Sequence, residues 1–375
     1  MTYSFAAPGR TELSGNHTDH QHGCVLAAAV NLETTAEVTL NGHDELCIIS
    51  DGYAPVRIGL NDLSVHSEEK NTTAALVRGI AAAFRAKGAE LKGFDATVRS
   101  TVLPGSGLSS SAAFEVLIGN IFNSLFFSDR CSAEEIAQIG QWAENVYFGK
   151  PSGLMDQMAS SVGGMVFIDF ADPEKPVVER LNFDFYKAGY ALCIINSGAD
   201  HADLTPEYAA IPEELGLLCK KFGKSVLREI PEETFFEKLP SLRGNVPDRA
   251  VLRAIHFYQE NKRVLAQVQA LQKNDIDTFL RLTNQSGQSS YMYLQNIIPT
   301  GSVDHQEMAL TLALCSTLLE GTGACRVHGG GFAGTALAIV PLERLDRFCS
   351  GIEAVLGKNC CKTLSVQPKG GRRVR

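Results

Sequence analysis

The segment from Gly105 to Ala113 reads Gly-Ser-Gly-Leu-Ser-Ser-Ser-Ala-Ala, which has the composition of a phosphate-binding loop without a Walker lysine. Its glycines allow the backbone to turn tightly and to approach a ligand closely. The serines from Ser109 to Ser111 stand where a following helix would leave its first N–H groups unpaired, and the helix dipole favours an anion there. The same residues could instead only cap the helix. The loop alone leaves both interpretations open.

A second polar segment runs from Gly9-Arg10 through Gly15-Asn16-His17-Thr18-Asp19-His20. It brings a cation, a carboxylate, imidazoles and an amide together ahead of an apolar stretch. Ligands rich in hydroxyl groups need such side chains, because each hydroxyl requires a placed donor and acceptor. Two other interpretations stay open. His17, His20 and His22 could bind a metal, although their spacing matches no standard zinc pattern, and the segment could be a capped surface turn.

The segment from Gly149 to Gln157 contains a single acid, Asp156, behind a stiff Pro–Gly turn. Such a turn could aim a carboxylate into a cleft, or Asp156 could cap a short helix. Glu144 lies on an expected helix before this turn and offers a second acid that could bind magnesium. Taken alone, Glu144 could equally be a solvated helix residue.

A glycine-rich turn from Arg326 to Gly334 runs into an apolar strand expected over 335–340. Successive glycines permit a backbone concavity whose N–H groups help to bind anions, although such a turn is weak evidence by itself. Another stretch, from Gly216 to Ser225, ends like a P-loop. Six residues instead of four separate its glycines, and its pattern is helical, so we reject it as a phosphate site.

Apolar patterns predict the elements that must position these segments. Alternation over 94–99 predicts a strand before the serine-rich loop, and apolar residues at three- and four-residue intervals from Ala112 to Leu125 predict a helix after it. We also expect strands over 25–39 (with a break near Asn31 and Leu32), 162–170 and 188–196, a hairpin over 43–60, helices over 72–87, 132–147 and 342–356, and mainly helix from Pro206 to about Leu319. This mixture predicts an α+β protein of two lobes, 1–186 and 187–375.

The composition is that of a large globular chain, with 375 residues of which 45% are hydrophobic and 20% charged. The net charge of −8 argues against a nucleic-acid partner. The N-terminus does not resemble a signal peptide, and no uncharged run of roughly 18 residues could span a bilayer. Ten cysteines occur without CxxC spacing. We therefore expect a cytoplasmic protein with reduced thiols and without a membrane partner.

In this order and at this spacing, the segments resemble the GHMP small-molecule kinase superfamily, and within it the galactokinase family. GRTELSGNHTDHQHGCVLAAAV resembles the N-terminal signature of that family, GSGLSSSAA its phosphate loop, and HGGGFAGT its C-terminal glycine motif. GKPSGLMDQ is similar to the segment that carries the catalytic aspartate. The stretch from His201 to Tyr208 is similar to the one that supplies a tyrosine to the sugar. The resemblance covers nearly the whole chain.

The resemblance implies a two-lobed fold with a mixed β-sheet N-terminal lobe, an α/β C-terminal lobe and the active site in the cleft between them. It implies an ATP- and magnesium-dependent kinase that phosphorylates α-D-galactose at its 1-hydroxyl. Asp156 would act as the base, or as the electrostatic partner of a hydroxyl that loses its proton late. Arg10 would keep Asp156 ionised and stabilise charge on the transferred phosphoryl group.

The same resemblance assigns the binding residues. Mg²⁺ would be held by Ser111 and Glu144. The residues expected at the sugar are Asn16, His17, Asp19, Gly153 and Tyr208, and those expected at the ATP phosphates are Gly105, Ser106, Gly107, Leu108, Ser109, Ser110 and Ser111. The expected partners are a small-molecule sugar and ATP, and the expected assembly is a monomer or a weak homodimer.

Two departures from the galactokinase pattern concern the sugar. Asn16 stands where the family has a glutamate that accepts a hydrogen bond near O6, and His20 stands where it has a tyrosine. An amide donates and accepts but carries no charge, so we expect Asn16 to weaken discrimination at C6 and to tolerate a carboxylate there. The alternatives are a kinase for galacturonate, arabinose or N-acetylgalactosamine, and a non-catalytic sensor of sugar and ATP derived from a kinase.

Overall fold

The computed structural model describes residues 1–102, 107–150, 152–199 and 204–375. The chain forms two compact units. The first comprises Met1–Thr11, Ala28–Gly164 and Val366–Arg375, and the second comprises Glu12–Ala27 and Met165–Ser365. No single boundary at residue 186 separates these units, because strands β1 (Thr2–Ser14) and β2 (Cys24–Leu40) each contribute residues to both of them. The limits 1–186 and 187–375 remain a prediction.

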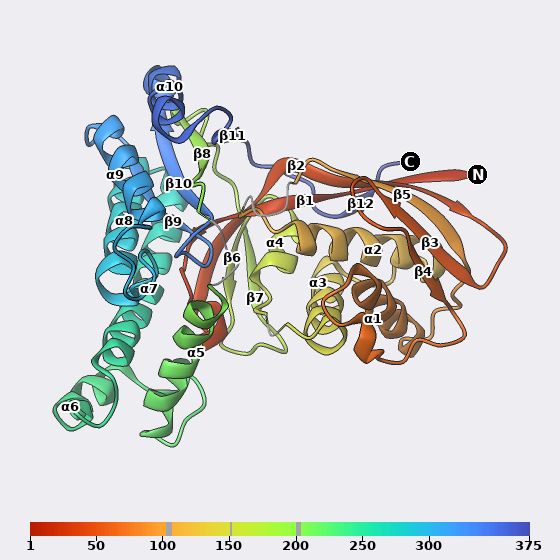
Figure 1. Cartoon of the computed structure of the whole chain (residues 1–375), viewed down its shortest axis with the longest axis horizontal. Coiled ribbons are helices and arrows are strands. Elements are labelled where there is room, and N and C mark those ends of the chain that lie inside the picture. The colour runs from red at the N-terminus through yellow and green to blue at the C-terminus, as the bar shows by residue number, and fades with distance from the viewer. Residues whose placement is uncertain (103–106, 151, 200–203) are drawn as a thin grey trace. The chain divides into compact units, whose positions relative to one another are not determined.

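The first unit is built on a mixed sheet with the strand order β12-β1-β2-β5-β3-β4 (Figure 1). Strands β2 and β5 (Phe94–Ser100) run antiparallel. Strands β3 (Glu45–Ser50) and β4 (Val56–Gly59) form an antiparallel hairpin, whereas β3 pairs with β5 in parallel. The mixed sheet expected for the N-terminal lobe is thereby confirmed.

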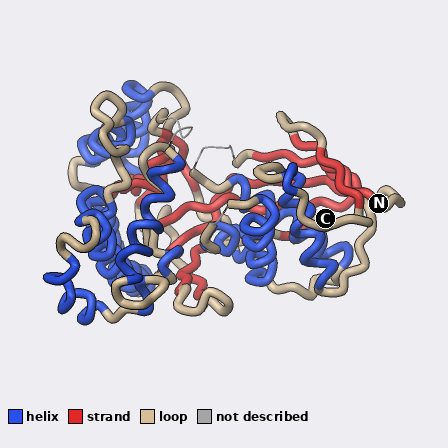
Figure 2. The backbone as a smooth tube through the Cα atoms, turned by 60° about the horizontal axis from the view of Figure 1, so that its bottom comes forward, coloured by secondary structure: helices blue, strands red, loops and turns tan. Residues whose placement is uncertain are grey.

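Helices cover one face of this sheet (Figures 1 and 2). They are α1 (Thr73–Ala86), α2 (Ser110–Phe126), α3 (Ala133–Ala143) and α4 (Met155–Val162). Strand β5 alternates buried and exposed residues, as a half-buried strand should. Beneath it, the rings of Phe84 and Phe122 stack 5.8 Å apart, and Phe122 meets Phe94 of β5 at 5.7 Å. These aromatic contacts hold α2 against the sheet.

Residues 366–375 return to the first unit and complete the edge of its sheet. Strand β12 (Arg372–Arg373) pairs antiparallel with β1. The N–H of Val374 donates to the carbonyl of Ser4 at 2.7 Å, and Arg372 forms an ion pair with Glu33 of β2 at 2.8 Å. The first unit therefore contains chain segments that are far apart in the sequence.

The second unit contains an antiparallel sheet with the order β11-β8-β10-β9. Of its two central strands, β10 (Thr335–Pro341) is buried along its whole length, as expected when both faces of a sheet are covered. The strands are β8 (Tyr190–Asn196), β9 (Ala324–His328), β10 (Thr335–Pro341) and β11 (Cys361–Leu364). The hairpin of β6 (Met165–Asp169) and β7 (Val177–Leu181) belongs to the other, mixed sheet, because β6 pairs with β2. The helices are α5 (Thr205–Lys220), α6 (Glu232–Leu242), α7 (Asp248–Gln272), α8 (Ile276–Ser289), α9 (Glu307–Leu319) and α10 (Leu345–Leu356).

Short helical turns connect several of these elements. They are η1 (Asp19–Gln21), η2 (Ser67–Glu69), η3 (Glu144–Phe148), η4 (Leu227–Glu229), η5 (Ser290–Leu294) and η6 (Leu342–Arg344), of which η3 and η5 are π-helices. The π-helix η3 continues α3 and ends at Gly149, which has a φ of 84°. The helix expected over 132–147 is therefore present, with a change of helical pitch at Glu144.

Most of the remaining predicted elements are also confirmed, including the hairpin over 43–60 and the helix over 72–87. The break expected near Asn31 and Leu32 is wrong, because β2 runs through it. The N–H of Ala29 is bound by the carbonyl of Gly164 before the expected break, and pairing with β5 begins at Thr34 after it. Strand β1 was not predicted, since its buried residues include polar ones that hide any apolar alternation.

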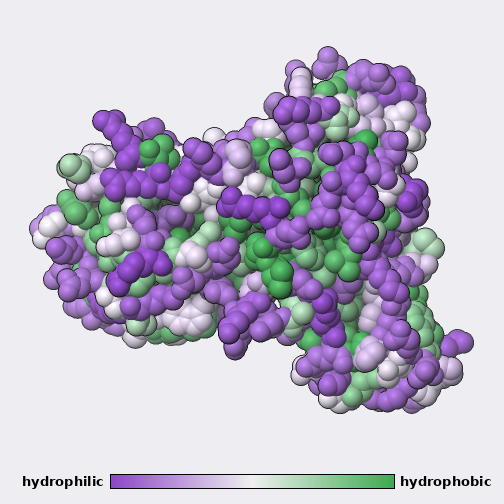
Figure 3. Space-filling model, turned by 180° about the vertical axis from the view of Figure 1, so that it is seen from behind, coloured by the Kyte–Doolittle hydropathy of each residue, from purple (hydrophilic) through white to green (hydrophobic). Residues whose placement is uncertain are grey.

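Within the described ranges, none of the helices is both long enough and apolar enough to cross a membrane. Figure 3 shows polar side chains over most of the displayed face, interrupted by smaller apolar patches. All ten cysteines are free thiols.

Phe122 provides a test of the packing in the first unit. Replacing this fully buried ring with alanine removes its contacts with Phe84 and Phe94 and leaves a cavity. We expect Phe122→Ala to lower the free energy of unfolding by about 3–5 kcal/mol in chemical denaturation. Val177 is 63% exposed, so Val177→Ala should change it by less than about 0.5 kcal/mol. Equal losses in the two variants would contradict this packing.

Candidate active site

A buried ion pair joins strand β1 to helix α4 in the first unit. The guanidinium of Arg10 meets the carboxylate of Asp156 through two parallel contacts, Nε to Oδ1 at 2.6 Å and Nη2 to Oδ2 at 2.7 Å. The side chain of Arg10 is 8% exposed and that of Asp156 is 29% exposed. Bidentate pairing of this kind gives a strong charge-assisted hydrogen bond with a defined geometry. The two residues that were expected to be catalytic are therefore in direct contact.

The same arginine also holds the serine-rich loop. Its Nη1 donates to the carbonyl of Gly107 at 2.5 Å, and its backbone N–H donates to the carbonyl of Leu108 at 3.0 Å. The preceding residue, Gly9, lies so close to the loop that an added Cβ would stand 2.9 Å from the carbonyl oxygen of Leu108. Glycine is required at this approach. Strand β1 and the loop are thereby tied together.

The described part of the loop leads directly into the N-terminus of α2. Gly107 and Ser109 adopt positive φ angles of 70° and 56°, which turn the chain sharply before the helix begins at Ser110. The first N–H groups of α2 have no partner within the helix, and its dipole favours an anion at this end. Gly105 and Ser106, which were also expected to bind phosphate, lie outside the described residues.

The environment of Asp156 keeps its carboxylate ionised. Burial acts to raise the pKa of Asp156, but the charge and hydrogen bonds of Arg10, together with a hydrogen bond from Ser109, outweigh burial and lower this pKa. Its place in the first turn of α4 also favours the negative form. A carboxylate with a lowered pKa is a weak base. Asp156 is therefore better suited to accept a hydrogen bond from a hydroxyl than to remove its proton early.

Glu144 is a second buried acid, at the point where α3 changes into the π-helix η3. One carboxylate oxygen accepts from Lys150 Nζ at 3.1 Å. The other accepts from Ser152 Oγ at 2.5 Å and from Gln157 Nε2 at 2.9 Å. The interpretation of Glu144 as a solvated helix residue is thus wrong, because its carboxylate is enclosed by polar partners.

Sequence reasoning missed a third acid, Glu115, beside Glu144. Glu115 lies on α2 and is fully buried, and its carboxylate accepts from the same Gln157 amide at 2.9 Å. Burial, and then the negative charge of Glu144, raise the pKa of Glu115 well above its usual value. This environment favours the neutral form of Glu115. The available signal was an acid on the apolar face of an expected helix, between Ala112 and Val116.

These residues offer the oxygen donors that a hard divalent cation prefers. Ser111 is half-buried in the first turn of α2, and Glu115 follows it by one helical turn on the same face. Oε1 of Glu115 and Oε1 of Gln157 are buried without a hydrogen-bond partner among the described residues. Buried oxygens left unpaired beside the carboxylate of Glu144 fit a cation such as Mg²⁺.

Asn16 lies in the second unit at the centre of a buried polar network. It is fully buried, and its Nδ2 donates to Glu12 Oε1 at 3.2 Å and to the carbonyl of Gly329 at 2.6 Å. Its Oδ1 accepts from Ser290 Oγ at 3.2 Å and from Asn296 Nδ2 at 2.9 Å. All four hydrogen-bonding positions of the amide are occupied by protein. The structure therefore gives Asn16 a positioning role and argues against direct contact with a ligand.

The glycine turn after β9 binds three of the expected sugar-site residues through its carbonyl oxygens. Gly329 accepts from Asn16, Gly330 accepts from His17 Nε2 at 2.9 Å, and Gly331 accepts from Tyr208 Oη at 2.9 Å. In these contacts the turn presents carbonyl oxygens, so its interpretation as a cradle of N–H groups for an anion receives no support here. The turn instead holds polar side chains in place.

The environment of His17 and His20 favours their neutral forms. His17 Nδ1 lies 3.2 Å from His20 Nε2, and the other nitrogen of His17 faces Gly330. Burial lowers the pKa of His17 and lowers that of His20 to about 3. With both nitrogens of His17 engaged by protein, the alternative of a histidine metal site is not supported. Among the described residues, the one group close enough to share a metal consists of cysteines.

Supporting residues that sequence reasoning missed lie behind Asn16. Glu12 forms a fully buried ion pair with Arg326. The N–H of Glu12 donates to His328 Nε2 at 3.0 Å. His256 Nε2 lies 2.9 Å from the carbonyl oxygen of Asn16, and Glu260 accepts from the N–H of Gly15 at 3.1 Å. Glu12, Arg326 and His328 lie within motifs seen in the sequence, but their roles depend on contacts between residues remote in the sequence, whereas no motif marks His256 and Glu260.

The remaining expected residues are divided between the two units. Asp19 begins the short helix η1 and is half-buried, and one of its carboxylate oxygens accepts from the N–H of His20 at 2.9 Å. Tyr208 is half-buried on α5, and burial raises its pKa to about 12, so its hydroxyl stays protonated. Gly153 lies in the first unit, shortly before α4.

Comparisons with known proteins agree with these motifs. The family model described as the GHMP kinases N terminal domain matches residues 75–164, and the galactokinase galactose-binding signature matches residues 2–40. A galactokinase of Glaesserella parasuis is 31% identical over 96% of this chain and 90% of its own length. A galactokinase of Actinobacillus pleuropneumoniae is 32% identical over 91% of this chain and 85% of its own length.

The fold has close counterparts among solved structures. The crystal structure of Lactococcus lactis galactokinase complexed with galactose superposes with a TM-score of 0.85 and covers 100% of this chain and 95% of the other, at 24% identity. This likeness confirms the expected two-lobed GHMP kinase fold.

The Arg10–Asp156 pair should make stability depend on pH in a defined direction. Because the pKa of Asp156 is lowered in the folded protein, its stabilising contribution is present above the unfolded-state pKa of about 3.9 and is lost as the pH falls through the folded-state pKa. At pH 7 we expect Asp156→Asn to cost about 3 kcal/mol, because Arg10 loses its buried partner.

Urea denaturation at a series of pH values measures this effect. The difference in unfolding free energy between the wild type and Asp156→Asn should shrink as the pH falls below about 4. Asp51 forms an ion pair with Arg99 in which 77% of each side chain is accessible, so Asp51→Asn serves as control. Its unfolding free energy should differ from that of the wild type by less than about 1 kcal/mol. A difference for Asp156→Asn that stayed constant with pH would count against the assigned ion pair.

Proposed function

The chain belongs to the galactokinase family, and from this premise we propose that it transfers the γ-phosphoryl group of ATP to the 1-hydroxyl of α-D-galactose. Relatives named galactokinase are more than 30% identical over most of the chain. Kinases of this superfamily use ATP as phosphate donor. The single observation that carries the proposed mechanism is the bidentate Arg10–Asp156 pair, bound to the phosphate loop through Gly107.

Asp156 is proposed to accept a hydrogen bond from the 1-hydroxyl of the sugar. Its lowered pKa supports a role in orienting this hydroxyl and in stabilising the positive charge that develops on its proton during attack. Phosphoryl transfer depends mainly on alignment and on neutralising charge, so an early proton abstraction is not needed. The proton can pass to the carboxylate as the new O–P bond forms.

Arg10 is proposed to serve both the acid and the phosphoryl group. Its Nε and Nη2 are occupied by Asp156, and its Nη1 is bound to the loop carbonyl of Gly107. The delocalised positive charge of the guanidinium lies at the loop itself, and there it can offset the charge that builds up on the transferred group. Substitution by lysine would keep the charge but lose the fork that binds both partners.

The ATP phosphates are proposed to bind at the loop from Gly105 to Ser110 and at the first N–H groups of α2. Ser111 and Glu144 are proposed as the protein ligands of Mg²⁺, and the buried unpaired oxygens of Glu115 and Gln157 support an electropositive ligand nearby. When bound, Mg²⁺ would neutralise charge on the β- and γ-phosphates.

The sugar is proposed to bind through His17, Asp19, Gly153 and Tyr208. Asn16 is proposed to fix the glycine turn that binds His17, because its amide donates to the carbonyl of Gly329 and His17 contacts the carbonyl of Gly330. The rest of this amide is saturated by Glu12, Ser290 and Asn296. This arrangement removes the reason for expecting a carboxylate to be tolerated at C6. Galactose is accordingly preferred to galacturonate as the proposed substrate, whereas arabinose and N-acetylgalactosamine stay as alternatives. A monomeric or weakly dimeric state and a cytoplasmic location remain predictions.

Phosphorylation of a sugar panel tests the proposal. With ATP and Mg²⁺, galactose should release ADP and form galactose 1-phosphate, identified by phosphorus NMR, and galacturonate should react far more slowly. Asp156→Asn should lower kcat by about 100-fold or more while leaving ATP binding near that of the wild type. Asp51→Asn serves as the matched control. A folded protein that binds galactose and ATP but releases no ADP would instead be a sensor, and the proposal would be discarded.

The two buried acids should respond differently to the same substitution. Burial favours the neutral form of Glu115, and glutamine matches that form in charge and shape, so Glu115→Gln should leave kcat near that of the wild type. Glu144→Gln removes a proposed metal ligand and should raise the Mg²⁺ concentration needed for half-maximal activity by about 10-fold or more. Magnesium titrations of the kinase rate measure both effects. An equal loss in Glu115→Gln would show that its charge is used.

A further inference from the structure

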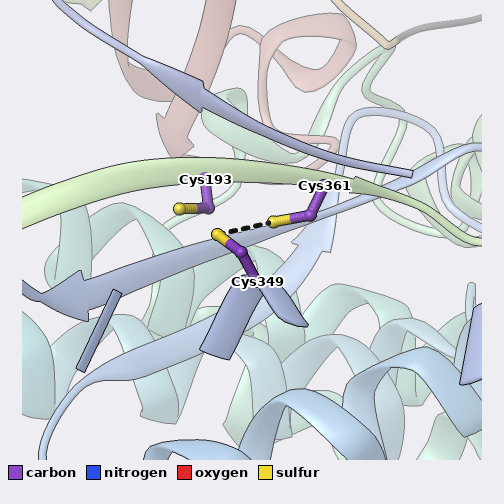
Figure 4. Close-up of side chains that lie close together, drawn as sticks. All are labelled: Cys193, Cys349 and Cys361. Atoms are coloured by element: carbon purple, nitrogen blue, oxygen red, sulfur yellow. Dashed lines mark hydrogen bonds between the residues drawn. The ribbon is translucent and has the colours of Figure 1, made fainter. Parts of the chain in front are cut away.

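Three cysteines from separate elements of the second unit lie close together, and the sulfur atoms of Cys349 and Cys361 face each other (Figure 4). Cys193 lies in β8, Cys361 begins β11, and Cys349 lies on α10. All three sulfurs lie within 4.8 Å of one another, and those of Cys349 and Cys361 are 3.6 Å apart. None of these residues has a part in the proposed kinase reaction.

The strand register explains why the three thiols meet. Strands β8 and β11 are antiparallel, and Cys361 stands opposite Ile195 while Thr363 stands opposite Cys193. Opposed residues share a face of the sheet, as do residues two apart on one strand, so Cys193 and Cys361 are diagonal neighbours on the same face. Helix α10 packs against β11 and brings Cys349 to the pair. The cluster is therefore built into the fold.

The surroundings of the cluster favour a ligand that bonds to sulfur. Cys193 is fully buried, whereas Cys349 and Cys361 are half-buried, so the cluster can be reached from solvent. Apolar side chains such as Ile195, Phe348 and Ile352 belong to the same core.

The number and spacing of the sulfurs indicate which ligand fits. Metal–thiolate bonds of about 2.3 Å, the length for zinc, separate the three sulfurs of a trigonal complex by about 4 Å. Thiolates select soft ions such as Cu(I) and Zn²⁺, and structural zinc is almost always four-coordinate. In the described part of the chain, no fourth histidine, cysteine or acid joins this group. Three sulfurs without a fourth ligand favour Cu(I), which is stable with three.

We propose that Cys193, Cys349 and Cys361 form a three-coordinate thiolate site for Cu(I). Binding forms three Cu–S bonds, and any proton still on a thiol passes to buffer. Copper stays in the +1 state and no sulfur is oxidised, so no oxidant or reductant is needed. The bound ion connects β8, β11 and α10, and it stabilises the folded protein because the unfolded chain does not hold the three sulfurs together.

Competition for Cu(I) tests this site in the full-length protein. The reduced protein is titrated under argon into the coloured Cu(I) complex of bicinchoninate, and the loss of colour reports copper taken up. We expect one Cu(I) per chain, an ultraviolet thiolate-to-copper band and a higher melting temperature. Loss of a residue that only supports a metal ligand typically lowers metal affinity by about 10–100-fold. Cys349→Ser and Cys361→Ser each remove a ligand, so each should lower the affinity for Cu(I) by more than this.

Cys47→Ser is the matched control, because Cys47 is a half-buried cysteine of β3 in the first unit. It should bind Cu(I) like the wild type. Circular dichroism and kinase activity without copper check the fold of each variant, and if Cys349→Ser does not fold, Cys361→Ser carries the same test. Unchanged affinity in the folded cluster variants, or an equal loss in Cys47→Ser, overturns the site. Tighter binding of Zn²⁺ in a four-coordinate complex overturns the three-coordinate assignment.

Discussion

The guanidinium of Arg10 has three of its nitrogens bound to parts of the first unit that must keep a fixed relation to each other. Two of them bind the carboxylate at the start of α4, and the third binds a backbone oxygen of the loop before α2. A buried charge that loses its partner is strongly destabilising. Strand, helix and loop therefore cannot shift independently of one another without breaking this contact. The same contact sets the ionisation of Asp156, so the position of the acid and its charge have one physical origin.

In the second unit, hydrogen bonds to backbone carbonyls hold three of the expected sugar-site residues. Its glycine turn presents carbonyl oxygens to Asn16, His17 and Tyr208, each of which donates a hydrogen. Asn16 also donates to Glu12, whose charge is balanced by Arg326. A glutamate at position 16 would lose both donors and place a second negative charge beside Glu12. The asparagine that departs from the family pattern is thus consistent with its own surroundings.

Much of this organisation could be predicted from the sequence, because the serine-rich loop, the Asp156 turn and most helices are local patterns marked by glycine, proline or apolar spacing. What could not be predicted depends on tertiary contacts. Glu115 lies within an apolar helix face, and the spacing of residues does not show that Gln157 will bridge it to Glu144. Residue types also do not tell whether a glycine turn presents N–H or carbonyl groups. The polar residues buried in β1 concealed a strand for the same reason.

The return of residues 366–375 to the first unit has a consequence for biosynthesis. Strand β12 and the Arg372–Glu33 ion pair close the edge of the sheet beside β1, but these residues leave the ribosome only after all of 165–365 has been made. Until then, the nascent first unit exposes an unpaired strand edge, which is the kind of surface that recruits other chains. The edge of the sheet is therefore completed only at a late stage of synthesis. Shielding of that edge by a chaperone would matter most before this stage.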